Sequence, residues 1–133
     1  MTVSESIITW LKDFENQSID TDILKVTVNR YALVKEPNQQ IKAYITGKKE
    51  YTDHYTFQAC LASQTNTDRI DNQEYGERLS EWVEEKNINQ EFPLLADAKV
   101  TYIGITTPFY MGQTATNESV YEMTIAIKYI KER

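Results

Sequence analysis

One stretch of the chain, residues 51–62, constrains the fold more than any other. Every second residue in it belongs to one set: Tyr51, Asp53, Tyr55, Phe57, Ala59 and Leu61. Successive side chains along a strand point to opposite faces of the sheet, so a period of two over this length indicates a long strand with one face on a core. Such a strand needs partner strands and a covering layer.

A helix that can supply this layer follows the strand. Four large apolar residues repeat with the spacing of one helical stripe: Tyr75, Leu79, Trp82 and Val83. Asp71 and Glu74 have the spacing of a capping box and predict the start of this helix. We expect it to end near residues 86–87. Gly76 lies inside it at a cost of up to ~1 kcal/mol relative to alanine, which indicates a close packing contact.

The residues before the long strand predict a first helix over residues 3–16, with Thr2 or Ser4 as N-cap. A strand is predicted over residues 24–33, with a phase shift near Arg30 that indicates a bulge or a strand end. Residues 36–38 read as a turn, and residues 41–45 as the next strand. With the long strand, this predicts three consecutive antiparallel strands.

Two further strands are expected in the C-terminal third, over residues 100–105 and 121–129. The uncharged residues 106–117 between them are expected to form a long loop that holds Phe109, Tyr110 and Met111. The prediction is therefore a single α+β domain over residues 1–133, with about five mostly antiparallel strands packed against two helices.

Composition and charge narrow the classes of function. A chain of 133 residues is long enough for one core and too short for two. Its formal net charge of -6 argues against direct nucleic-acid binding, which depends on clustered Lys and Arg. The single Cys60 cannot form an internal disulfide or a cysteine metal cluster. The sequence shows neither a signal peptide pattern nor a membrane-spanning run, so we expect synthesis in the cytoplasm and no membrane partner.

The candidate catalytic and metal-binding residues each have a simpler interpretation. His54 lies beside Asp53, but adjacent strand residues point to opposite faces and cannot share a proton directly. The acidic residues of the second helix lack the glycine-centred spacing of a calcium loop. Gly47-Lys48-Lys49 lacks the earlier glycines of a phosphate loop and is typical of a hairpin turn. We therefore expect no enzymatic activity, no metal ion and no cofactor.

Several segments, in order, also carry a family resemblance: Tyr44-Ile45-Thr46-Gly47, Tyr51-Thr52-Asp53-His54-Tyr55-Thr56-Phe57, Asn72-Gln73-Glu74-Tyr75-Gly76-Glu77, Leu79-Ser80-Glu81-Trp82-Val83, Phe92-Pro93-Leu94, and Tyr121-Glu122-Met123-Thr124-Ile125 with Tyr129. Their order and spacing resemble the minor capsid, or minor structural, proteins of long-tailed bacteriophages and prophages, which are similar to tail terminators. The resemblance covers residues 44–129.

The resemblance implies a virion structural protein at the head–tail interface: a tail terminator or head–tail joining subunit. Such subunits form a homo-oligomeric ring, typically of six, that caps the tail tube, so the implied partners are other copies, the tube protein and head-side connector proteins. The alternative is an intracellular, non-catalytic module of α+β fold that binds a peptide or a small ligand.

A ring would give the uneven charge a role, because one face of each subunit must complement a different face of the next. Residues 68–97 hold nine acids and three bases. We expect contacts between subunits from two oppositely charged groups: Lys42, Lys48 and Lys49 against Glu74, Glu77, Glu81, Glu84 and Glu85. The apolar residues Phe109, Tyr110 and Met111 are expected to dock on the tube or the connector.

Overall fold

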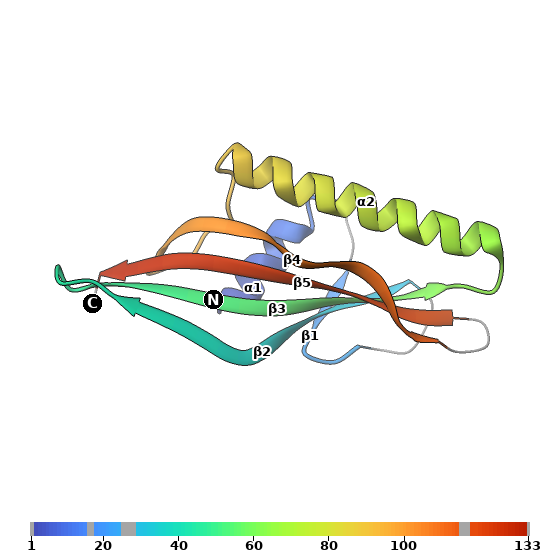
Figure 1. The fold of residues 1–133 in the computed structure, drawn as a ribbon, viewed down its shortest axis with the longest axis horizontal. Coiled ribbons are helices and arrows are strands. Elements are labelled where there is room, and N and C mark those ends of the chain that lie inside the picture. Colours follow the sequence, from blue (N-terminus) through green and yellow to red (C-terminus); the bar gives the residue numbers. More distant parts are fainter. Residues whose placement is uncertain (1, 16–17, 25–28, 115–117, 133) are drawn as a thin grey trace.

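The computed structural model describes residues 2–15, 18–24, 29–114 and 118–132. The elements in chain order are α1 (Val3–Leu11), β1 (Ile19–Thr21), β2 (Arg30–Ala43), β3 (Lys48–Ala62), α2 (Asn66–Ile88), β4 (Lys99–Thr114) and β5 (Glu118–Glu132). The strands form one sheet of order β1-β2-β3-β5-β4 (Figure 1). β1 pairs with β2 in parallel and every other pair is antiparallel, which confirms the predicted α+β class.

The predicted alternation of the long strand is confirmed and sets the position of the core. β3 is the central strand and pairs with β5 over its whole length, so that Tyr55 faces Ile125 and Phe57 faces Met123. These residues form one buried cluster with apolar side chains of both helices, which include Leu11 of α1. The domain is thus a two-layer structure, with both helices on the same face of the sheet.

The first helix begins as predicted and ends earlier. Thr2 is the N-cap, and it forms a capping box with Glu5. The helix ends at Leu11 rather than at residue 16, and turns follow through Glu15; residues 16–17 lie outside the described part of the chain. Phe14, which lies beyond the helix, is still buried in the core. An apolar residue with helical spacing therefore does not need to lie in the helix.

The predicted strand over residues 24–33 is only partly described. Residues 25–28 lie outside the described chain. β2 begins at Arg30, where a bulge or a strand end was expected, and Leu24 belongs to no strand. β1, a short strand over residues 19–21, was not expected from the sequence. An ion pair of 3.1 Å between Arg30 and Asp20 joins β1 to β2.

The turn predicted at residues 36–38 is wrong. β2 runs continuously through them, and its register with β3 shifts between Lys35 and Gln39. This irregularity accommodates Pro37, which has no N–H to donate to the ladder. The two short strands predicted on either side are one long strand, which forms a hairpin with β3.

The second helix also begins earlier than predicted. Its capping box is formed by Thr65 and Asp68, not by Asp71 and Glu74, which lie inside the helix. The close contact expected at Gly76 is confirmed: a Cβ added there would lie 2.5 Å from Cδ2 of Phe109. Glycine therefore allows α2 to approach β4 closely at this point.

The predicted loop over residues 106–117 is wrong as well. β4 continues through residue 114, with register shifts relative to β5 on both sides of Thr107. Residues 115–117 lie outside the described chain. The bulges let an uncharged segment that contains Pro108 remain in the sheet as an edge strand.

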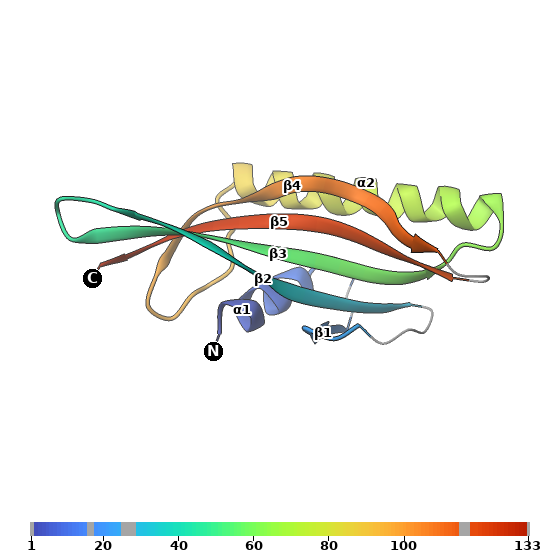
Figure 2. The same ribbon diagram turned by 60° about the horizontal axis from the view of Figure 1, so that its bottom comes forward.

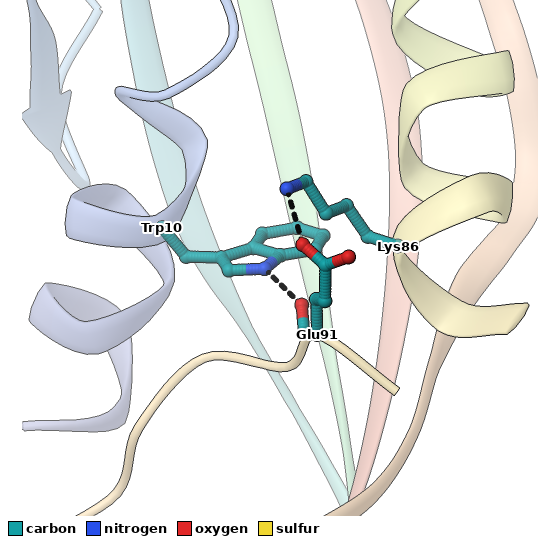
Figure 3. Close-up of polar contacts among 3 residues, drawn as sticks. All are labelled: Trp10, Lys86 and Glu91. Atoms are coloured by element: carbon teal, nitrogen blue, oxygen red, sulfur yellow. Dashed lines mark hydrogen bonds and ion pairs between the residues drawn. The ribbon is translucent and has the colours of Figure 1, made fainter. Parts of the chain in front are cut away.

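A small polar contact joins the two helices to the segment that follows α2. Nε1 of Trp10 donates to the carbonyl oxygen of Glu91 at 2.7 Å, and Nζ of Lys86 lies 2.8 Å from a carboxylate oxygen of the same residue (Figure 3). The ring of Trp10 also packs 4.6 Å from that of Trp82. No helix in the described chain is long and apolar enough to cross a membrane.

Candidate functional site

The β2–β3 hairpin projects beyond both helices at one end of the molecule (Figures 1 and 2). We call its residues 41–49 the arm. Ile45 at its turn is fully exposed (107%), and Ile41 and Tyr44 are 56% and 40% exposed. The turn closes at Gly47, whose φ of 92° is accessible to glycine at little cost. Three exposed apolar side chains within five residues form a patch that a solvated hairpin does not require.

The arm is also basic. Lys42, Lys48 and Lys49 all belong to it, and Nζ of Lys42 lies 5.4 Å from the centre of the Tyr44 ring. Lys49 faces Lys131 across the β3–β5 ladder. Like charges opposite each other on a sheet repel, whereas Lys42 lies opposite Glu50 and Lys48 opposite Glu132.

A groove runs between α2 and the edge strand β4. It comprises two cavities of about 610 and 510 Å³, which share Ser80 and Pro108. Its apolar lining comes mainly from β4: Ile103, Ile105, Pro108, Phe109 and Met111. The volumes are in the range of ordinary ligand sites, which is ~300–1,000 Å³.

The helix side of this groove is acidic. All five acidic residues expected at a subunit interface lie on α2 and are exposed: Glu74, Glu77, Glu81, Glu84 and Glu85. Glu77, Glu81 and Glu84 line the groove, and Arg69 lies at one end of it. The sequence therefore identified the charged surface, but not the cavity beside it, because the cavity depends on the separation of α2 from β4.

Phe109, Tyr110 and Met111 do not form one exposed cluster. Phe109 is half-buried, and its ring stacks on Tyr121 at 5.2 Å and packs against Tyr75 at 5.7 Å. Met111 is half-buried too, whereas Tyr110 is 48% exposed. All three line the groove, so Tyr110 is the residue among them that is most available to a partner.

The strand places Asp53 and His54 on opposite faces, as predicted. Asp53 is buried in the core face, with 1% of its surface exposed, and His54 points to the other face of β3. The carboxyl group of Asp53 accepts a hydrogen bond from Nε2 of Gln39 at 2.7 Å and one from the hydroxyl of Tyr129 at 2.8 Å. In the described chain, no three metal-ligating side chains lie close enough together to hold a metal ion.

This buried Asp–Gln–Tyr cluster was not predicted. The shift in register between Lys35 and Gln39 brings Gln39 opposite Asp53. The sequence did contain one sign of it, because an acidic residue lies among the alternate positions of the strand that face the core. A carboxyl group buried there requires hydrogen-bond donors. Both of these donors come from within the chain, and the carboxyl group of Asp53 is enclosed in the core.

Tyr129 of this cluster and the nearby Tyr55 have raised pKa values. Burial raises the pKa of Tyr55 to about 12; Ser4 opposes the rise and the nearby Asp53 adds to it. Burial also raises the pKa of Tyr129, and its hydrogen bond to Asp53 adds to this effect. Both side chains are enclosed in the core.

We expect the free energy of unfolding to decrease as the pH rises above 10. An unfolded tyrosine loses its proton near pH 10, whereas folded Tyr55 keeps it until about pH 12, so alkaline pH favours the unfolded chain. At pH 11 the loss from Tyr55 alone is on the order of 1 kcal/mol, because it accumulates at ~1.4 kcal/mol per pH unit above pH 10. Urea unfolding between pH 8 and 11 measures it. Tyr55→Phe should be nearly neutral at pH 8 and less sensitive to pH; equal slopes for both chains would contradict this.

The sequence was compared with protein-family models and with curated proteins, and it matches none of them.

Proposed function

We propose that this chain is a virion structural protein of the tail-terminator or head–tail joining type, whose copies form a ring on the tail tube of a long-tailed phage or prophage. The observation that carries the proposal is the projecting arm, with Ile45 fully exposed at its end. An apolar patch on an extended hairpin is best explained by burial in an assembly. The sequence segments that resemble the phage family, and the order in which they occur along the chain, support the same function.

The proposal assigns a role to the charged surfaces. Contacts in a ring are heterologous, so a basic surface of one subunit meets an acidic surface of the next. Lys42, Lys48 and Lys49 would face the acidic residues of α2, and these partly screened charges would set register and association rate more than affinity. Tyr110, beside the packed Phe109, would contribute to docking on the tube or the connector.

The mass of the protein in solution tests this proposal. We expect light scattering to show a ring of several subunits, typically six, as the concentration rises, and electron microscopy to show closed particles. Lys48→Glu with Lys49→Glu should weaken assembly at low salt, because these changes put like charges at the contact. The matched control is Lys12→Glu with Lys99→Glu, two exposed lysines outside the arm. A 15.5 kDa particle at every concentration would contradict the proposal.

The groove favours a second candidate, a non-catalytic module that binds a peptide. An extended peptide could pair with an edge strand, but Pro108 and four shifts in register interrupt β4. Such a peptide would therefore bind mainly through its side chains. A monomeric chain that binds basic apolar peptides, and loses them on Glu81→Lys, would favour this candidate over the ring.

A further inference from the structure

The side chains that line the α2–β4 groove determine which kind of segment could bind there. Its lining on β4 is apolar, and three acids on α2, Glu77, Glu81 and Glu84, line its other side. Apolar side chains would be buried against the strand, while cations beside them would face the helix. The groove is therefore complementary to a narrow segment with an apolar end and flanking basic residues.

The arm of the same chain has these properties. Its apolar residues Ile41, Tyr44 and Ile45 are exposed, and Lys42, Lys48 and Lys49 alternate with or follow them in sequence. The arm projects beyond the helices at one end of the molecule, past the end of α2 (Figures 1 and 2). It is therefore directed away from the groove of its own subunit.

We propose that the arm of one subunit inserts into the α2–β4 groove of the next. This inference rests on the proposed ring, and it names the two surfaces that form the repeating contact. Ile45 enters the groove near Ser80 and Pro108, and the lysines of the arm pair with Glu77, Glu81 and Glu84. Each subunit supplies one arm and one groove, which come from different elements, so the contact is heterologous. Repeating it gives a closed ring when the rotation from one subunit to the next is a whole fraction of a full turn.

The alternative contact, in which the neighbour's hairpin pairs with the outer edge of β4, is disfavoured. β4 shifts register against β5 at four places and contains Pro108, and both features protect an edge strand from further pairing. Pro37 in β2 protects the corresponding edge of the hairpin in the same way. The arm therefore contributes side chains to the groove rather than a sixth strand to the sheet.

Disulfide trapping tests the contact directly. Two differently tagged full-length chains, one with Ile45→Cys and one with Ser80→Cys, are mixed and oxidised. Native Cys60 is buried and does not compete. The control pair combines Ile45→Cys with Thr124→Cys, which lies on the other face of the sheet and is half-buried like Ser80. We expect a covalent heterodimer about tenfold or more above the control pair, and a ladder of covalent oligomers when one chain carries both Ile45→Cys and Ser80→Cys.

A second pair of variants measures the contribution of the apolar tip. Ile45→Asp should raise the concentration needed for assembly by about tenfold or more. The change removes apolar surface from the tip of the arm and puts a negative charge next to the acidic residues of the groove. Ile23→Asp is the matched control, since Ile23 is 73% exposed and lies outside the arm. Both residues are exposed, so both variants should keep the melting temperature of the native chain.

The outcomes separate the two proposals. If the native chain forms rings but Ser80→Cys traps no more than Thr124→Cys, the arm–groove contact is wrong and the ring stands. Equal effects of Ile45→Asp and Ile23→Asp on assembly would also overturn the contact. If the native chain stays a single particle at all concentrations, the ring proposal fails, and this inference fails with it.

Discussion

Asp53→Ala is expected to lower the free energy of unfolding by about 3 kcal/mol, as a buried carboxyl group is lost from between two donors. The hydroxyl of Tyr129, which is 3% exposed, would remain in the core without its acceptor at 2.8 Å. Gln39 lies on the exposed part of β2, so its amide can turn to water. Most of the loss therefore comes from Tyr129 and from the space left by the carboxyl group.

Urea unfolding at neutral pH measures this loss. The matched control is His54→Ala, the adjacent residue on the other face of the same strand, which should change the free energy of unfolding by less than about 1 kcal/mol. Combining Asp53→Ala with Tyr129→Phe removes acceptor and donor together, so the double variant should lose less than the sum of the two single variants. Strict additivity, or a larger loss from His54→Ala, would contradict the assigned hydrogen bonds.

The sequence predicted the parts of the fold that follow from regular periodicity. The alternation around Phe57 and Met123 predicted the two central strands, and the stripe of Leu79 and Val83 predicted the helix that covers them. These patterns are reliable because burial acts on every second residue of a strand and on one side of a helix. The end of the first helix and the start of the second were predicted wrongly, because several residues near a helix terminus compete for the same capping role.

The remaining errors arose where a local turn signal was overridden by the sheet. Pro37 and Pro108 favour turns in isolation, yet both lie in strands, at or near a shift in register. Each of these strands gains a ladder of hydrogen bonds along its neighbour, and a bulge accommodates the proline. The sequence does not encode this outcome locally, because it depends on the length of the partner strand.

The candidate site was only partly predictable for a related reason. Exposed charges such as Glu81 and Lys49 can be recognised in the sequence, because charged residues are rarely buried without a partner. The groove could not be recognised, because it results from the packing distance between α2 and β4. Two contacts bear on that distance: Gly76 lies against Phe109, and the backbone N–H of Ile103 donates to Oδ1 of Asn87 at 3.1 Å.

Gly76→Leu is expected to lower the free energy of unfolding by about 3 kcal/mol, although leucine is the better helix former by up to ~1 kcal/mol. A Cβ at this position would meet Cδ2, Cγ and Cβ of Phe109 at 2.5–2.8 Å. Phe109 cannot move aside easily, since its ring is stacked on Tyr121 and packed against Tyr75. The helix would therefore be pushed away from β4, and the packing beneath it would be lost.

Urea unfolding tests this prediction, with Asp71→Leu, an exposed position on the same helix, as the matched control. The control should change the free energy of unfolding by less than about 1 kcal/mol. Phe109→Ala added to Gly76→Leu should recover part of the loss, because the leucine can occupy the space of the ring; a coupling of about 1–2 kcal/mol is expected. Without such coupling, the separation of α2 from β4, and with it the shape of the groove, would have to depend on other contacts.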